Sequence, residues 1–341
     1  METLTYDPCL LISTKESHEF GVVSMQTDDT LILGNKDFLA REQNEIAKAG
    51  FLTKPIRVLL PTETITFNGC TITMDGDSLY MSQKGQGARL ELVDAGKEDY
   101  KKAYREQRAR AAYLATICQP EATFDLSVAA QHQDPTEDDV KALNLRLQWQ
   151  MDNLERGLRY VPVDLRSAKV YVFVDGSFAN NKDLSSQIGF VLAIGAETVG
   201  DAQFTLTGNI VHTSSTKCKR VTRAVLASEL YAMVAGIDML ISLGTTINMV
   251  TDKLGISRLP TIVCTDSLSL YECIVKLGTT KEKRLMIDIM AIRQSYERRE
   301  LTEVRWINGA NNPADAMTKS APNKALRDFI DTNILTVKME G

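Results

Sequence analysis

Three consecutive stretches in the second half of the chain are rich in β-branched and aromatic residues. They predict strands at 169–177, 186–194 and 203–213. The first of these strands is apolar at successive positions, which is typical of a central strand covered on both faces. A helical pattern of apolar positions follows from Arg220 to Leu243, and Gly244 is a typical helix stop.

The remainder of this half alternates short strands with helices. Further strands are predicted at 259–265 and 302–307, and helices are predicted from about Ser267, over 283–298 and after Pro313. The five strands and their helices predict an α/β fold (α+β over the whole chain), in which a mixed five-stranded sheet carries helices on its faces.

The first half of the chain predicts smaller elements. Two β-type runs within 20–34 flank Gln26-Thr27-Asp28-Asp29, which indicates a hairpin with two acidic residues at its tip. A helix is predicted over 36–50 and a single alternating strand over 65–74. A turn at 75–77 then leads into a strand at 78–81.

The pattern from 98 to 160 is helical, with a polar break from Gln131 to Pro135. Apolar residues on one helical face are Val140, Leu143, Leu147, Leu154 and Leu158. Pro162 predicts a boundary with the strands that follow. We therefore expect three domains, at 1–97, 98–162 and 163–341.

Composition narrows the class of protein. The 341 residues are 44% hydrophobic and 24% charged, which is ordinary for a globular protein. No apolar run reaches the length of a membrane span, and the acidic N-terminus is no secretory signal, so we expect no membrane partner. Six scattered cysteines without a CxxC motif predict reduced thiols in an intracellular protein.

Charge gives a mixed indication about nucleic acid. The formal net charge of -5 argues against tight nonspecific binding. Basic residues nevertheless cluster at Lys217 to Arg223, at Lys281 to Arg284, and at Arg298 to Arg305. Each cluster alone is equally compatible with solvated helix ends.

Four acidic residues occupy positions typical of a shared site. Asp175 ends the first apolar strand, Glu229 lies within the long helix, Asp266 follows the 259–265 strand, and Asp315 opens the last helix. Each has a structural alternative, which is respectively a turn-forming Asp-Gly, a boundary glutamate, a helix N-cap context and a first-turn acid. Their occurrence together favours convergence at one end of the sheet.

Carboxylates on separate elements can hold two divalent cations about 3.5–4 Å apart, which clamp the attacking and leaving oxygens of a phosphodiester. We expect two Mg²⁺ ions, with Mn²⁺ as the alternative. The clustered carboxylates should have coupled and partly raised pKa values before a cation binds. With three histidines in the chain, a histidine-based zinc site is not expected.

Residues 170–320 resemble the RNase H domain of copia-class LTR retrotransposon Pol polyproteins, in a fungal-type variant. The stretches that carry the resemblance are 173–190, 214–231, 264–267 and 312–319. The resemblance implies that Asp175, Glu229, Asp266 and Asp315 are metal ligands. It further implies that Asp175 bridges both ions, that Glu229 and Asp266 hold the leaving-group ion, and that Asp315 holds the ion that activates water.

The first half resembles the C-terminal part of the reverse transcriptase of the same polyproteins. Residues 25–29 are similar to the Asp-Asp turn of the palm, and 67–83 to the primer-grip region. Residues 111–127 are similar to the thumb and connection. Asp28 and Asp29 would then be a vestigial polymerase metal site, because the chain begins just before them and Gln26 replaces the usual aromatic neighbourhood.

These resemblances imply a partial palm (1–97), a helical thumb or connection (98–162) and an RNase H-like domain (163–341). The implied reaction is endonucleolytic hydrolysis of the RNA strand of an RNA–DNA hybrid. No histidine lies between Trp306 and Asn312, where many RNases H carry one, so we expect slower turnover. Two alternatives remain: a catalytically inactive remnant that binds nucleic acid or a partner, and a partial polymerase that needs a missing palm and fingers.

Contacts to the hybrid are expected from polar residues that flank the predicted site. These candidates are Ser177, Asn180, Asn181, Lys182, Ser214, Ser215, Lys217, Lys219 and Asn311. Self-association, or association with other retrotransposon products, is a further expectation. The expected location is the cytoplasm or a virus-like particle, with the nucleus as an alternative.

Overall fold

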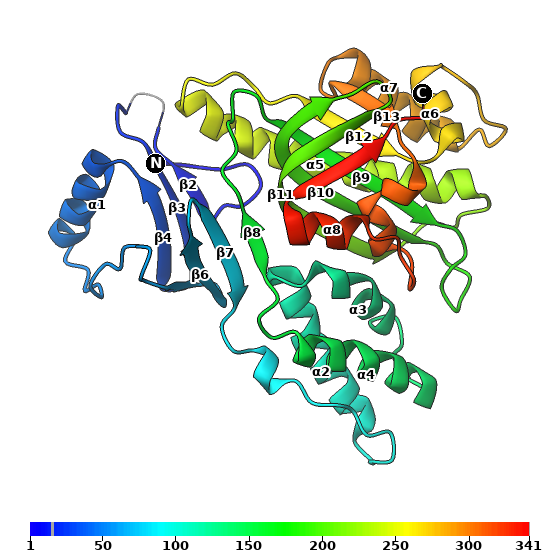
Figure 1. Ribbon diagram of the computed structural model, residues 1–341, viewed down its shortest axis with the longest axis horizontal. Coiled ribbons are helices and arrows are strands. Elements are labelled where there is room, and N and C mark those ends of the chain that lie inside the picture. The colour runs from blue at the N-terminus through cyan, green and yellow to red at the C-terminus, as the bar shows by residue number, and fades with distance from the viewer. Residues whose placement is uncertain (15–16, 341) are drawn as a thin grey trace.

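The computed structural model describes residues 1–14 and 17–340 (Figure 1). Within these residues the chain forms two four-stranded sheets in its first half and a six-stranded sheet in its second half. A group of helices precedes the last strand of the second sheet in the sequence and lies below the third sheet in Figure 1.

The six-stranded sheet has the strand order β13-β12-β9-β10-β11-β14. The strands are Lys169–Ser177 (β9), Gln187–Val199 (β10), Gln203–Lys217 (β11), Thr261–Thr265 (β12), Glu303–Trp306 (β13) and Ile334–Lys338 (β14). β9, β10, β11 and β14 pair antiparallel, whereas β12 is parallel to both β9 and β13. The sheet is mixed as predicted, but the expected number of five strands was wrong because β14 adds an edge strand.

Both faces of this sheet are covered, which explains why β9 is apolar at successive positions. Val172 and Val174 pack with helices α5 (Val225–Lys253), α6 (Leu268–Val275) and α7 (Leu285–Glu297) on one face. Tyr171 and Phe173 pack with α8 (Ala325–Thr332) on the other. Two short 3₁₀ turns, η3 (Gly309–Asn311) and η4 (Pro313–Met317), join β13 to α8. The helix predicted directly after Pro313 is therefore a 3₁₀ turn followed by a separate helix.

The bounds predicted for the long helix were wrong at both ends. Ala224 before α5 is extended, with φ -154° and ψ 159°, so Arg220 and Arg223 precede the helix instead of lying in its first turns. Gly244 lies inside α5 and does not stop it. The helix ends at Lys253, and Gly255 beyond it has a φ of 67°, the left-handed conformation that terminates helices.

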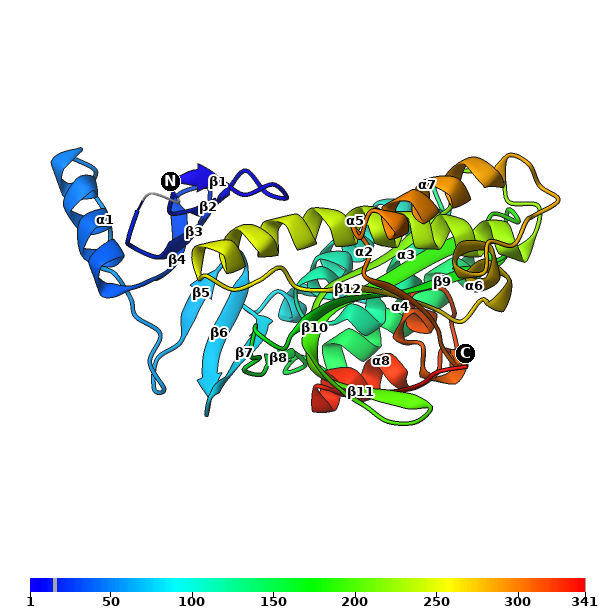
Figure 2. The same ribbon diagram turned by 90° about the horizontal axis from the view of Figure 1, so that it is seen from above.

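The expectation that no apolar run has the length of a membrane span was also wrong, since α5 reaches that length and composition. An 18-residue window of it has a mean hydropathy of 1.6 and is 44% buried. Its residues Leu230, Met233 and Leu240 belong to the core shared with β9, and this packing accounts for the apolar composition. Figure 2 shows α5 continuing past the sheet toward the N-terminal strands, where the Tyr6 amide donates to Thr246 Oγ1 at 3.1 Å.

The first sheet contains the predicted hairpin. Its strands are Glu2–Thr3 (β1), Leu10–Ile12 (β2), Gly21–Gln26 (β3) and Asp29–Gly34 (β4), followed by helix α1 (Lys36–Lys48). Gln26 pairs with Asp29, so Thr27 and Asp28 form the loop between β3 and β4. Asp28 and Asp29 are both exposed.

The second sheet consists of Ile65–Phe67 (β5), Cys70–Asp75 (β6), Ser78–Gln83 (β7) and Leu158–Tyr160 (β8). The single strand predicted over 65–74 was wrong. Asn68 and Gly69 have φ values of 45° and 72° and form a tight turn between β5 and β6. This Asn-Gly pair is a strong hairpin signal. The predicted turn at Gly76 and Asp77 is confirmed.

The helical segment comprises η1 (Gly87–Arg89), α2 (Tyr100–Ile117), η2 (Pro120–Ala122), α3 (Thr123–Ala129) and α4 (Glu137–Asp152). Thr136 caps α4 by accepting from the Asp139 amide. Val140, Leu143 and Leu147 are buried in the helical core as predicted. Leu154 and Leu158 do not extend this face, because α4 ends at Asp152 and Leu158 belongs to β8.

Candidate metal centre

The parallel pairing of β9 and β12 brings two of the predicted acids together. Val174 pairs with Thr265, so Asp175 and Asp266 lie beside each other where the carboxyl ends of both strands meet. Glu229 comes from α5, which approaches β9 closely at Gly176. A Cβ atom at Gly176 would lie 2.5 Å from the Ser228 carbonyl, so the glycine permits this approach.

Asp175, Glu229 and Asp266 form a compact acidic group. Each offers a carboxylate oxygen, and these oxygens all lie within 4.8 Å of one another. Asp175 is 3% exposed and Glu229 is 7% exposed, while Asp266 is half-buried. Oε2 of Glu229 is buried and accepts no hydrogen bond. Such an orphaned oxygen is costly in a protein interior, and a bound cation would satisfy it.

The electrostatics of the group reflect burial and mutual repulsion. Burial first, and the charge of Asp266 second, raise the pKa of Asp175 to about 6. Burial and the charges of Asp175 and Asp266 raise the pKa of Glu229 well above its usual value. Burial also raises the pKa of Asp266. These shifts indicate a site whose negative charge is only partly compensated and that would gain stability from a cation.

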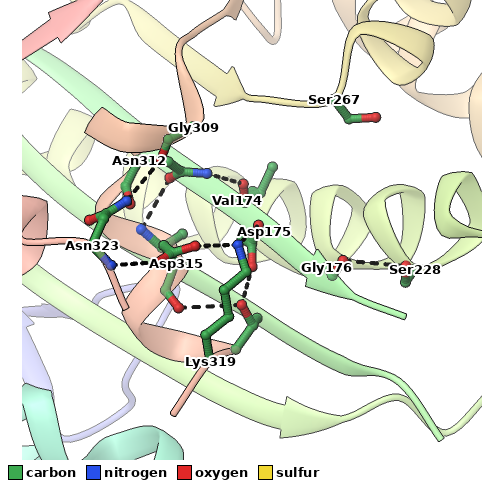
Figure 3. A network of polar contacts seen from close by, with 12 residues as sticks. Val174, Asp175, Gly176, Ser228, Ser267, Gly309, Asn312, Asp315, Lys319 and Asn323 are labelled. Atoms are coloured by element: carbon green, nitrogen blue, oxygen red, sulfur yellow. Dashed lines mark hydrogen bonds and ion pairs between the residues drawn. The ribbon is translucent and has the colours of Figure 1, made fainter. Parts of the chain in front are cut away.

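Asp315 lies beside this group but is not part of it within the described residues. Its Oδ2 accepts from the Asn323 amide at 2.7 Å, and its Oδ1 pairs with the Lys319 ammonium. The same ammonium lies 3.9 Å from Asp175 Oδ1, between the two carboxylates (Figure 3). Three of the four predicted acids therefore converge, and the fourth is joined to them through a lysine.

Polar side chains from the η4 region hold the acids in place. Asn312 is fully buried and donates through Nδ2 to the Val174 carbonyl at 3.0 Å (Figure 3). Thr318 is also buried, and its hydroxyl donates to Asp175 Oδ2. Sequence reasoning assigned no role to Asn312, Thr318 or Lys319. The available signal was the i,i+4 spacing of Asp315 and Lys319, which is typical of ion pairs.

The structure distributes the predicted substrate-binding residues unevenly. Asn180 lies near the acids, because its Nδ2 donates to the Thr318 carbonyl at 3.0 Å. Asn181 and Ser215 are buried and bonded to Gln187, an internal network that leaves them little surface for a ligand. Lys182 pairs with Asp139 of α4.

The remaining candidates lie at the ends of strands or on the surface. Ser177 ends β9 and is half-buried, as is Ser214 in β11. Lys217 is exposed and pairs with Asp183, and Lys219 is exposed beyond β11. Asn311 Oδ1 accepts from the Lys338 amide at 3.2 Å.

The donor set fits a hard divalent cation. Asp175, Glu229 and Asp266 all offer carboxylate oxygens. Mg²⁺ and Mn²⁺ prefer such oxygens to thiolate or imidazole ligands. The orphaned Glu229 oxygen supplies an unused ligand position. Asp28 and Asp29, at their exposed hairpin tip, are not members of this group.

No protein-family model and no curated protein matches the sequence. Among solved structures, RNase H1 from the archaeon Halobacterium salinarum is 17% identical with a TM-score of 0.30, covering 47% of this chain and 98% of that one. LC11-RNase H1, solved in complex with an RNA/DNA hybrid, is 22% identical with a TM-score of 0.32, covering 46% and 99%.

A longer match is the protease–reverse transcriptase of prototype foamy virus. It is 12% identical with a TM-score of 0.25, and the match covers 81% of this chain and 40% of that one. At these identities and TM-scores the likeness shows no family and assigns no activity to this chain. The interpretation below therefore rests on the sheet and its carboxylates.

Proposed function

We propose that this protein is a ribonuclease H-type hydrolase that cleaves the RNA strand of RNA–DNA hybrids with divalent cations. The observation that carries the proposal is the convergence of Asp175, Glu229 and Asp266 within 4.8 Å, with an unpaired oxygen on Glu229. Cations held there would supply Lewis-acid stabilisation of the negative charge that develops as the phosphodiester is hydrolysed.

The residues of the chain have distinct tasks in this proposal. Asp175 is the central ligand, because it contacts both the acidic group and Lys319. Thr318 fixes the orientation of Asp175 through its hydroxyl. Asn180, on the loop after β9, would contact a phosphate or a ribose 2′-hydroxyl, the group that distinguishes RNA from DNA; its hydrogen bond to the Thr318 carbonyl, beside Asp175, supports this role.

We further propose that the chain derives from a copia-class retrotransposon Pol polyprotein of the fungal type, on the resemblance of its motifs. Residues 1–97 would correspond to part of a reverse-transcriptase palm and 98–162 to its thumb or connection. The exposure of Asp28 and Asp29 at a hairpin tip is compatible with this interpretation.

The test is cleavage of a labelled RNA–DNA hybrid by the full chain in Mg²⁺. We expect cleavage by the wild type, and a loss of at least about 100-fold in Asp175→Asn and in Glu229→Gln, because each removes a cation ligand and its charge. Asp201→Asn, at an exposed loop between β10 and β11, is the matched control and should retain activity.

Hybrid binding measured in parallel separates the alternatives. Binding without cleavage by the wild type would favour the inactive remnant over the hydrolase. Equal cleavage by the wild type and by Asp175→Asn would remove the acidic group from the reaction.

A further inference from the structure

Lys319 occupies a position that none of the proposed roles explains. Its ammonium pairs with Asp315 Oδ1 and lies 3.9 Å from Asp175 Oδ1, so it stands between two carboxylates (Figure 3). Among the described residues, the ion pairs of this lysine are with these two acids. Glu229 and Asp266, the other two members of the acidic group, form no ion pair with Lys319 in the part of the chain that the structure describes.

Lys319 is charged but not enclosed. Burial alone would lower the pKa of Lys319, but the charges of Asp175 and Asp315 raise it overall, so the ammonium remains protonated at neutral pH. The side chain is 45% exposed, whereas those of Asp175 and Asp315 are 4% and 8% exposed. Burial therefore fixes the two carboxylates in place. The Lys319 side chain borders solvent, and its flexible stem can turn outward.

We propose that the Lys319 ammonium is a tethered cation that holds Asp315 in the substrate-free protein and competes with a divalent ion for this carboxylate. The inference rests on the proposed function, because it takes Asp175, Glu229 and Asp266 as the first cation site. Lys319 is a positioning residue in this account.

The competition follows from charge and space. A cation bound to both Asp175 and Asp315 would occupy the gap where the ammonium now lies, and two positive charges at such a distance repel strongly where water is partly excluded. Binding of an ion at Asp315 therefore requires that Lys319 turn away. Glu229 and Asp266 form no such ion pair among the described residues, so the first ion should bind to them and to Asp175 while Lys319 stays paired with Asp315.

The experiment is a Mn²⁺ titration of the full chain without substrate. Binding is measured by calorimetry and by the electron paramagnetic resonance signal of free Mn²⁺. For the wild type we expect one ion bound tightly and a second bound at least tenfold more weakly. Lys319→Ala should raise the affinity for the second ion at least tenfold and leave the affinity for the first ion within about threefold of the wild-type value. Lys319→Arg, which keeps the charge, should behave as the wild type does.

Lys276→Ala is the matched control, because Lys276 also pairs with a carboxylate at i,i+4 spacing, with Glu272 on the surface of α6. Lys276→Ala should change the affinity for neither ion. Lys319→Met, which keeps most of the aliphatic stem, replaces Lys319→Ala if circular dichroism shows that the alanine variant is unfolded.

The outcomes distinguish this inference from the proposed function. A tight first ion with a second ion unaffected by loss of the Lys319 charge would overturn the inference alone. Weaker binding of the second ion after removal of the lysine would also overturn it. Absence of any Mn²⁺ binding to the wild type would overturn both. A wild type that shows the competition but cleaves no hybrid would leave the inference standing and remove the proposed activity.

Discussion

Asp175 and Glu229 are buried carboxylates that the fold keeps close together at a cost in stability. Asp175 is 3% exposed and Glu229 is 7% exposed, and the oxygens they offer lie within 4.8 Å of each other and of Asp266. Ionised carboxylates are strongly disfavoured in such surroundings unless a positive charge compensates them. Lys319 compensates part of this charge, and we attribute the remaining requirement to divalent cations.

Asp175→Asn should stabilise the cation-free protein at neutral pH. The pKa of Asp175 in the folded chain is about 6, above its ordinary 3.8, mainly because of burial. The folded state therefore binds more protons than the unfolded state between these values, and its stability falls as pH rises through this window. The raised pKa corresponds to a loss of folding stability of roughly 1–3 kcal/mol. This loss is complete above about pH 6 and absent below about pH 3.5.

The measurement is urea unfolding in EDTA at pH 3.5 and pH 7.5, with Asp201→Asn as the exposed control. The predicted gain appears at pH 7.5 and vanishes at pH 3.5. An Asp175→Asn variant that is less stable than the wild type at pH 7.5 without cations would contradict this interpretation of the buried charge.

At the scale of elements, the site depends on how closely α5 can approach β9. Gly176 allows the backbone at Ser228 to lie against the strand, and this contact brings Glu229 to Asp175. Asn312, which donates to the Val174 carbonyl, holds the η4 turn and Asp315 against the same strand end. The carboxylates of Asp175, Glu229 and Asp266 converge because β9, α5 and the end of β12 meet there.

Gly176→Ala should destabilise the protein and spread the acidic group. The added Cβ would lie 2.5 Å from Ser228 backbone atoms and 2.7 Å from the Glu229 amide, so α5 would have to move. Overpacking of this kind costs about 1–3 kcal/mol. Gly244→Ala, within α5, is the control. Its Cβ would lie 3.9 Å from Thr261 Cγ2, an ordinary contact, so this change should stabilise α5 by about 0.5–1 kcal/mol.

Unfolding curves for both variants, with Mn²⁺ affinity as a second reading, test this contact. Equal stabilities for Gly176→Ala and the wild type would show that α5 does not need the glycine.

Sequence patterns predicted the elements around the site well because burial on two faces leaves a clear signature, as in β9. They failed where the end of a helix or the presence of a strand depends on backbone conformation or on pairing with a distant segment. Gly244 could not be distinguished from Gly255 as the helix stop, because the left-handed φ belongs only to the latter. β14 is a short edge strand whose partner β11 lies far away in the sequence.

The same limit applied to the candidate site. The motifs indicated all four acids, but the position of Lys319 between Asp175 and Asp315 depends on the meeting of β9 with the η4 region. The burial of Ser215 and Asn181 likewise results from tertiary packing around Gln187. No local pattern records such contacts.

Over the whole molecule, the charge balance opposes binding to nucleic acid, because the formal net charge is -5. Binding to a hybrid must then depend on local basic residues. Lys217 and Lys219 lie exposed at the end of β11, although Lys217 already pairs with Asp183. β11 belongs to the six-stranded sheet and lies away from helix α1 (Figure 2).

The double variant Lys217→Ala, Lys219→Ala should weaken hybrid binding and flatten its salt dependence. Loss of one or two phosphate contacts reduces the slope of log K against log salt by about 1–2. Fluorescence anisotropy across a salt titration measures this slope, and Lys36→Ala with Lys48→Ala on α1 is the control. An unchanged slope in the first variant would remove both lysines from the interface.

The central claim is that the acidic group hydrolyses RNA paired with DNA. The most direct measurement uses the purified full chain and a hybrid whose RNA and DNA strands carry different labels. We predict that in Mg²⁺ the RNA strand is cut at internal positions and the DNA strand stays intact, with no cleavage in EDTA. Cleavage of the DNA strand, cleavage that persists in EDTA, or an intact RNA strand in both Mg²⁺ and Mn²⁺ would contradict the account.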